Sequence, residues 1–358
     1  MWLIAIDEAG YGPKLGPLVV AATLWRRDDA ALDAAMQDRS IDAADPDAFI
    51  PIAGPVCVQS TAIRVDDSKQ IFRSRASGKS GGSLAMLQRI VSVSHHACGR
   101  TEPDLACRIA TLIPDDFARI ADVPWLASLT DSRRIRSIVE SAWTPRSECD
   151  EAIAHWSRSP WQLIDVAARM IDAGCFNQFC GAASGANKSD LLGETSIALA
   201  ANLLRTLDDR QPPVRSPTNE PVQIYFDRHG GRRYYAAPLQ PHFGKTPVQV
   251  ISESARQSVY ETRWSGRTVR MHFSVKGDRF IPVALSSLHA KYLREVAMAS
   301  LNDYFRERCQ AVASKGDQCD SSFVPTAGYP TDADRFLNEI AAAIRAERIS
   351  LGDLVRCR

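Results

Sequence analysis

The sequence has no excess of either charge, no long apolar run and no paired-cysteine motif. Its 43 lysines and arginines nearly balance 42 aspartates and glutamates, so binding to a polyanion must come from local clusters of basic residues. No uninterrupted apolar run approaches the roughly 18 residues of a membrane span, and no basic region precedes the first apolar stretch as in a signal peptide. Nine cysteines without a CxxC pair indicate reduced thiols in a cytoplasmic protein.

Two short apolar runs open the chain, joined by a turn rich in glycine and proline. The first leads into Asp7 and Glu8, and the second spans Leu18 to Leu24. Runs of this kind predict buried strands. Adjacent carboxylates at the end of a buried strand are costly to desolvate unless a cation or other partners accompany them. Because side chains alternate along a strand, both reach one ion only where the strand ends or one side chain bends round its edge. The alternative is an ordinary polar pair at a strand-to-turn boundary.

Two later strands also end in a carboxylate. The apolar run from Val222 leads to Asp227 and a Gly-Gly turn, and the last of three strand-like runs in 248–276 leads to Asp278. Hard divalent cations prefer oxygen ligands, and two of them among four carboxylates form a site for in-line displacement at phosphorus. If the three strand ends meet, the sequence predicts such a site at Asp7, Glu8, Asp227 and Asp278.

Helical spacing marks other parts of the chain. It predicts helices over 84–93, 190–207, 282–308 and 332–348. Between Pro103 and Pro160 the chain is broken repeatedly by proline and shows no catalytic spacing. We interpret 95–185 as an inserted, mostly helical subdomain whose tryptophans belong to its core; the alternative is a functional aromatic platform. Those tryptophans are Trp125, Trp143, Trp156 and Trp161.

The order of these motifs resembles the type 2 ribonuclease H family. The stretch DEAGYGPKLGPLVVAA from Asp7 is similar to the family's opening Asp-Glu-Ala-Gly motif and second strand. Asp67-Ser68-Lys69 resembles the family's Asp-Ser-Lys box. Asp227 in YFDRHGG resembles the family's third carboxylate. Asp278 in KGD, followed by a helix that carries Lys291, resembles the family's fourth carboxylate. Gly328-Tyr329-Pro330-Thr331 resembles a late Gly-Tyr-Pro motif, so five ordered matches cover about half of the chain.

The resemblance implies a ribonuclease H-like mixed sheet flanked by helices, with a helical insertion and a helical C-terminal part. The corresponding segments are 1–94 and 187–310 for the main domain, 95–186 for the insertion and 311–358 for the C-terminal extension. It further implies endonucleolytic cleavage of the RNA strand in RNA/DNA hybrids with Mg²⁺ or Mn²⁺, leaving 3′-hydroxyl and 5′-phosphate ends. A monomer that acts in the cytoplasm in DNA replication and repair is the accompanying expectation.

Individual roles follow from the same resemblance. Asp7, Glu8, Asp227 and Asp278 become the metal-binding acids of the catalytic site. Lys69 and Lys291 become phosphate contacts, with ordinary solvated lysines as the alternative. Gly10 and Gly12 let the backbone approach a ribose, since glycine has no Cβ, and the 2′-hydroxyl distinguishes RNA from DNA. Tyr329 packs on a sugar or base near the cleaved bond, or serves as a packing residue.

The chain departs from the family pattern in its first loop. Tyr11 stands where the family has arginine or lysine, and a tyrosine offers a hydroxyl and a stacking face in place of a charge. Lys14 is the candidate to replace that charge. Basic residues also gather in 228–233 and 256–279, where they predict phosphate contacts or a solvated face. His229 in that turn is a bystander or a proton shuttle.

Other function classes remain in competition. One is a nuclease with a different substrate, because Tyr11 and the insertion alter recognition. Another is a non-catalytic nucleic-acid-binding protein, against which the four retained acids speak, since carboxylate repulsion contributes nothing to binding a polyanion. A sugar-kinase or actin-like ATPase would require a second Asp-Gly phosphate loop and an adenosine motif, and the sequence contains neither.

Overall fold

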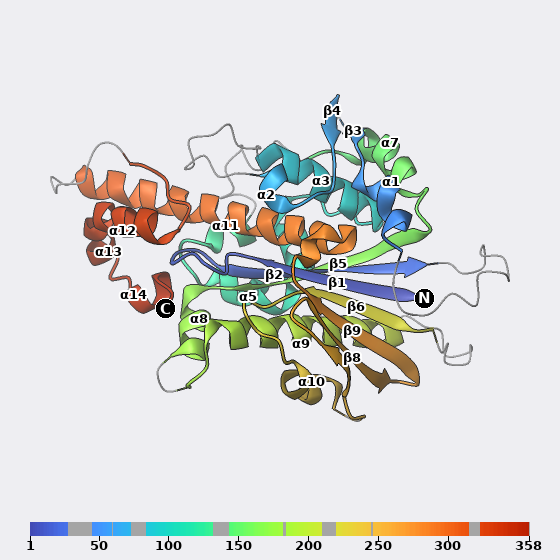
Figure 1. Cartoon of the computed structure of the whole chain (residues 1–358). Coiled ribbons are helices and arrows are strands. Elements are labelled where there is room, and N and C mark those ends of the chain that lie inside the picture. The colour runs from blue at the N-terminus through green and yellow to red at the C-terminus, as the bar shows by residue number, and fades with distance from the viewer. Residues whose placement is uncertain are drawn as a thin grey trace.

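The centre of the structure is a seven-stranded mixed sheet. Its strands are β1 (Trp2–Ala9), β2 (Leu18–Arg27), β5 (Trp161–Ile171), β6 (Val222–Asp227), β7 (Gln249–Glu253), β8 (Gln257–Trp264) and β9 (Arg267–Ser274). They lie in the order β5-β2-β1-β6-β9-β8-β7, with β6 parallel to β1 and β9 and every other neighbouring pair antiparallel (Figure 1). This computed structural model describes residues 1–27, 45–58, 60–72, 84–131, 143–181, 184–209, 220–244, 246–314 and 323–357.

Helices cover both faces of the sheet. They are α3 (Leu84–Ala97) and α11 (Ile281–Ala313) on one face, and α9 (Lys188–Asp209) and α10 (Ala236–Phe243) on the other (Figure 1). Leu3 and Ala5 of β1 belong to the core beneath α11, whereas Ile4 and Ile6 belong to the core beneath α9. A strand with helices on both sides needs apolar side chains at every position, which explains the unbroken apolar run at the start of the chain.

Short elements and a C-terminal group of helices complete the fold. They are η3 (Pro46–Phe49), α1 (Ile50–Ala53), β3 (Val56–Val58), β4 (Thr61–Ile63), α2 (Ser68–Ile71), α4 (Leu105–Leu112), α5 (Pro114–Ala121), η5 (Ala127–Thr130), α7 (Arg146–Trp156), α8 (Ala173–Cys180), η6 (Gly277–Arg279), α12 (Pro330–Glu339), α13 (Ala341–Ala346) and α14 (Leu351–Leu354). In Figure 1, α12 and α13 lie beside the second half of α11, and α14 lies close to the C-terminus near α8.

The predicted mixed α/β sheet flanked by helices is confirmed, including the strands in 248–276 and the long helix α11. Two local expectations differ from the structure. The helix expected over 332–348 is divided at Ile340 into α12 and α13. Within 95–186, which we expected to be mostly helical, β5 forms an edge strand of the central sheet and pairs with β2. The division of the chain into four segments stays a prediction.

The tryptophans of 95–185 lie mainly in the core, as expected. Trp125, Trp156 and Trp161 are buried, and Trp143 is half-buried with its ring against His95. The eight cysteines in the described ranges are free thiols. A search of the same ranges finds no helix that combines the length and apolar character needed to span a membrane.

Candidate active site

Asp7 and Asp227 end two neighbouring parallel strands. Pairing between β1 and β6 runs up to Ile6 opposite Phe226, so these aspartates occupy the next position on each strand. Because side chains alternate, both point to the face that α11 covers, opposite to Ile6 and Phe226. Asp7 is buried, and Glu8 follows it where only β2 still pairs with β1. The structure thus brings the acids of two strand ends to one edge of the sheet.

Asp278 reaches the same edge through a close backbone contact. Its short helix η6 follows β9, and the N–H of Gly277 donates to Oδ1 of Asp227 at 2.7 Å. A Cβ on residue 277 would lie 3.0 Å from the Cα of Asp227, so glycine permits this approach. The third strand end therefore meets the other two, as the candidate metal site requires.

The acids line a cavity of about 700 Å³. Nine of the eleven site residues expected from the sequence line it: Asp7, Glu8, Gly10, Tyr11, Lys69, Asp227, Asp278, Lys291 and Tyr329. Gly12 and Lys14 do not. The structure brings together most of the predicted site, while the role of each residue stays a prediction.

Negative charge accumulates on the floor of this cavity, which consists of Asp7, Glu8, Asp227 and Asp278. Burial, together with the carboxylates of Glu8 and Asp227, holds the pKa of Asp7 well above its ordinary value. Burial and Asp227 raise the pKa of Glu8 to about 7. Burial is also the main cause of the raised pKa values of Asp227 and Asp278. Among the described residues none of the four forms an ion pair, so the floor favours a proton or a cation.

Lys69 is the basic residue placed beside these acids. It lies in the first turn of α2, whose N-cap Asp67 accepts a 2.8 Å hydrogen bond from the N–H of Lys69. Ser287 of α11 donates to Ser68 at 3.2 Å and so holds α2 against the long helix. The charge of Lys69 opposes the rise in the pKa values of Glu8, Asp227 and Asp278. The Asp-Ser-Lys segment thus places a cation at the edge of the acidic floor.

The donor set fits a hard divalent cation in kind. All four floor side chains offer carboxylate oxygens, and burial raises the pKa of each of them. Within the described ranges, however, no three histidine, cysteine, aspartate or glutamate side chains form a group that could hold a metal ion as they stand.

Two arginines contact the glycine loop after β1 at Gly10. Gly10 has φ +89°, and a Cβ there would lie 2.6 Å from the carbonyl oxygen of Pro17 and 2.9 Å from Cδ of Arg294. Arg356 donates through Nη1 to the carbonyl of Gly10 at 2.7 Å. Gly12 differs, because no atom lies within 4 Å of an added Cβ. At Gly10, therefore, other parts of the chain pack against the backbone where a Cβ would lie. At Gly12 that space is open.

Lys14 lies away from the acidic floor. Its ammonium pairs with Asp334 at 2.6 Å, and its backbone N–H donates to the carbonyl of Gly328 at 2.8 Å. These contacts join the glycine loop to the C-terminal part of the chain. The expectation that Lys14 replaces the charge missing at Tyr11 gains no support from this position.

Arg294 is a cavity residue that the sequence analysis missed. It is 1% exposed, donates to the carbonyl of Ala327 at 2.8 Å and holds its guanidinium 5.9 Å from the ring centroid of Tyr329. The signal available in the sequence was its spacing, three residues after Lys291 on the same helix face. Other cavity residues that the sequence analysis did not identify are Ser68, Phe72, Ser287 and Glu295.

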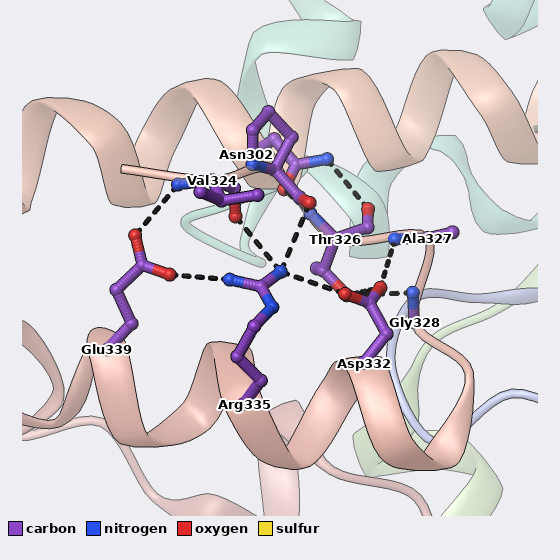
Figure 2. A network of polar contacts seen from close by, with 9 residues as sticks. Asn302, Val324, Thr326, Ala327, Gly328, Asp332, Arg335 and Glu339 are labelled. Atoms are coloured by element: carbon purple, nitrogen blue, oxygen red, sulfur yellow. Dashed lines mark hydrogen bonds and ion pairs between the residues drawn. The ribbon is translucent and has the colours of Figure 1, made fainter. Parts of the chain in front are cut away.

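A polar network fixes the loop that carries Tyr329 (Figure 2). Asp332 accepts from the hydroxyl of Thr326 at 2.6 Å and from the N–H of Ala327 at 2.8 Å, while Arg335 bridges Asp332 and Glu339 (Figure 2). On the other side, Asn302 of α11 exchanges two hydrogen bonds with the backbone of Thr326. This network ties the loop to α11 and α12 and leaves Tyr329 51% exposed at the cavity.

The basic turn after β6 is largely engaged in structural contacts. Arg228 donates to the carbonyls of Ser254 and Ala255, and Arg232 pairs with Asp190. His229 does not line the cavity; it is packed against aromatic rings, and burial, with the charge of Arg232, lowers its pKa to about 3. These positions favour the bystander role for His229 over proton transfer.

Comparisons with known proteins give no sequence relative. No protein-family model matches the chain, and no curated protein matches its sequence. Solved structures do align with it at low similarity. Ribonuclease H2 of Pyrococcus horikoshii OT3 is 13% identical with a TM-score of 0.42, over 99% of this chain and 92% of that one. Ribonuclease HII of Archaeoglobus fulgidus, solved in a complex with PCNA, is 15% identical with a TM-score of 0.36, over 100% and 95%.

A third structure, Bst-RNase HIII in complex with Mn²⁺, is 12% identical with a TM-score of 0.35, over 99% of this chain and 66% of that one. Similarity at these values shows neither family membership nor activity for this chain. The fold assignment rests on the strand order and helix layers described above, and the functional argument rests on the cavity.

Proposed function

We propose that the protein is a metal-dependent endoribonuclease that hydrolyses the RNA strand of RNA/DNA hybrids. The observation that carries the proposal is the convergence of Asp7, Glu8, Asp227 and Asp278 from three strand ends on one cavity, without an ion pair to any described residue. Perturbed carboxylates in a cleft are typical of catalytic or metal-binding sites. The five ordered sequence motifs supply the substrate class, by resemblance.

The four carboxylates are the groups that would hold Mg²⁺ or Mn²⁺. When bound, such ions activate the attacking water and stabilise the leaving 3′ oxygen of an in-line displacement, so that a 5′-phosphate remains on the other fragment. The carboxylates at the ends of β1 and β6 would hold the ions, and the scissile phosphate would bind through them. Lys69, beside the acids, and Lys291, which lies on α11 and pairs with Glu295, are the basic groups to which we assign the nonbridging phosphate oxygens.

The remaining cavity residues fit the sugar and the base. The added-Cβ position at Gly12 is free of protein atoms, which suits a close approach to a ribose, whereas the same position at Gly10 is occupied by Pro17 and Arg294. Tyr329 offers an exposed aromatic face at the cavity, and such faces stack on bases or sugars. Tyr11 lines the same cavity with a ring and a hydroxyl.

A cleavage assay with two labelled duplexes tests the function. One carries a continuous RNA strand against DNA and the other a single ribonucleotide in DNA, each with Mg²⁺ or Mn²⁺, and Asp7→Asn is the control. We expect the continuous hybrid to be cleaved to 3′-hydroxyl and 5′-phosphate products and the variant to be inactive. If wild-type protein binds the metal and leaves both duplexes intact, the proposal is wrong. Cleavage of both would mean that recognition of a lone ribonucleotide tolerates Tyr11.

Two other functions each have a specific observation in their favour. A non-catalytic nucleic-acid-binding protein would account for carboxylates that, in the described ranges, do not form a ready metal group. A nuclease for another substrate would account for Tyr11 and the displaced Lys14. Metal titration separates the two, because only a nuclease gains activity as the ion binds. Monomeric state, cytoplasmic location and a role in DNA replication and repair accompany the main proposal as predictions.

A further inference from the structure

Each aromatic ring that lines the acidic cavity has a cation on its face. Lys291 lies 4.9 Å from the ring centroid of Phe72, and Arg294 lies 5.9 Å from that of Tyr329. The third pair is Lys188 with Tyr11, at 4.9 Å. A cation on an aromatic face beside a cavity can neutralise a phosphate while the ring remains available for stacking.

Lys188 differs from the other two cations in having no acidic partner. Lys291 and Arg294 both contact Glu295, at 2.6 and 3.2 Å. Within the described ranges Lys188 forms no ion pair, and its side chain is exposed. The acid in the first turn of its helix, Asp190, is paired with Arg232. The positive charge of Lys188 is therefore available to a ligand.

Tyr11 fixes where that charge lies. Burial raises the pKa of Tyr11 and the neighbouring Ser189, the residue after Lys188, opposes that rise, while a Cβ on Gly230 would lie only 3.3 Å from the Tyr11 hydroxyl oxygen. The ring thus bridges the glycine loop after β1, the first turn of α9 and the turn after β6. The exposed ammonium of Lys188 therefore lies over a ring that lines the cavity, just outside the lining itself, and its charge is opposite in sign to the floor carboxylates.

We propose that Lys188 is a phosphate-binding residue for the nucleic-acid substrate, placed by Tyr11, and that it extends the substrate site from the acidic floor toward α9. The inference rests on the proposed function in taking nucleic acid as the ligand. The basic contact on this side of the cavity then comes from Lys188 of α9. Position 11 of the glycine loop is a tyrosine, and Lys14 is paired with Asp334.

The test is a salt titration of binding by the full-length protein, measured by fluorescence anisotropy in EDTA so that no metal-dependent cleavage occurs. Wild type is compared with Lys188→Gln, Lys188→Arg and Arg205→Gln. Arg205 is a matched control because it is an exposed cation farther along the same helix. We expect Lys188→Gln to weaken binding of the hybrid about fivefold and to reduce the slope of log K against log salt by about 0.9, the loss of one phosphate contact. Lys188→Arg and Arg205→Gln should match wild type.

A double-mutant cycle tests the positioning by Tyr11. If the ring places Lys188, Tyr11→Leu should reduce the same slope, and Tyr11→Leu/Lys188→Gln should lose less than the sum of the two single changes. Tyr11→Phe, which keeps the ring, should retain most of the affinity. Additive losses would overturn the pairing of Tyr11 with Lys188.

The results separate this inference from the proposed function. A wild-type slope for Lys188→Gln, or an equal loss in Arg205→Gln, overturns the inference even if the protein cleaves hybrids. Wild type that binds duplexes without cleaving them overturns the nuclease proposal, and the loss of slope in Lys188→Gln then still supports the phosphate contact. A protein that binds neither duplex overturns the inference outright.

Discussion

Two groups of acids lie within a few residues of the same cavity and have opposite surroundings. On α12, next to the loop that carries Tyr329, Asp332 and Glu339 are both paired with Arg335 (Figure 2). Burial alone would raise the pKa of Asp332, but hydrogen bonds from Thr326 and Arg335 outweigh it and keep the pKa below its ordinary value. On the cavity floor, burial and mutual repulsion raise the pKa values of Asp7 and Glu8.

The contrast separates stabilising acids from functional ones. The ionised form of Asp332 is more stable in the folded chain than in water, because its partners donate hydrogen bonds to it and carry a positive charge. The ionised floor carboxylates are less favourable in the folded chain than in water, since four of them share a cavity in which the charge of Lys69 offsets their burial and repulsion only in part. A fold that keeps an unfavourable cluster of acids does so for a ligand that supplies the missing positive charge.

The largest effect should come from removing one floor charge. We expect Asp227→Asn to lower the cleavage rate by about 10³-fold, because the site loses a metal-binding carboxylate. The same change should raise the thermal stability of the metal-free protein, since it relieves repulsion. Asp332→Asn is the comparison, and it should leave kcat within about threefold. Equal losses in both variants would mean that the floor acids act only through structure.

The next largest effect is on stability and concerns the loop. Asp332→Ala removes two hydrogen bonds to the loop and the contact with Arg335, and should lower the free energy of unfolding by about 2 kcal/mol. Asp334→Ala is the control, because its pairing with Lys14 is exposed and worth within about 0.5 kcal/mol. Denaturant titrations of both variants measure the difference. A loss at Asp332 no greater than at Asp334 would remove the contrast between the two regions.

The site is more predictable from sequence than its surroundings. Asp7, Asp227 and Asp278 each follow an apolar run, and runs of this kind identify strands without tertiary information. Parallel neighbours end at the same edge of a sheet, so the convergence of two of these acids follows from the β1–β6 pairing. That pairing itself came only from the structure, because periodicity does not specify which strands are neighbours.

The parts that escaped prediction depend on contacts distant in sequence. β5 has charged residues at positions that break a clean alternation, and they pair with residues distant in sequence: Asp165 pairs with Arg100, which follows α3, and Arg169 pairs with Asp116 of α5. Arg294 and Lys188 are unremarkable on their helices, and their importance appears only once their aromatic partners lie beside them. Local patterns do not encode these pairs.

The smallest effect expected is on the pH dependence of stability without metal. The pKa of Glu8 is raised from its ordinary value to about 7, so between about pH 4.5 and 7 the folded protein binds more protons at this site than the unfolded chain. Stability should therefore fall as pH rises through that window. Glu8→Gln lacks this proton equilibrium, so its stability relative to wild type should increase as the pH rises from 4.5 to 8, with most of the change below pH 7.

Mg²⁺ should cancel this difference at the upper end of the window. An ion that binds the ionised carboxylates stabilises only the folded wild type, by an amount that grows with its concentration above the dissociation constant. The gain should be larger at pH 8 than at pH 5, where protons compete with the metal. Paired denaturant titrations at the two pH values, with and without Mg²⁺, measure the stability difference between the variant and wild type and the stabilisation by Mg²⁺. If Glu8→Gln and wild type change in parallel with pH, Glu8 is paired in solution, and the contrast between floor and loop does not extend to this residue.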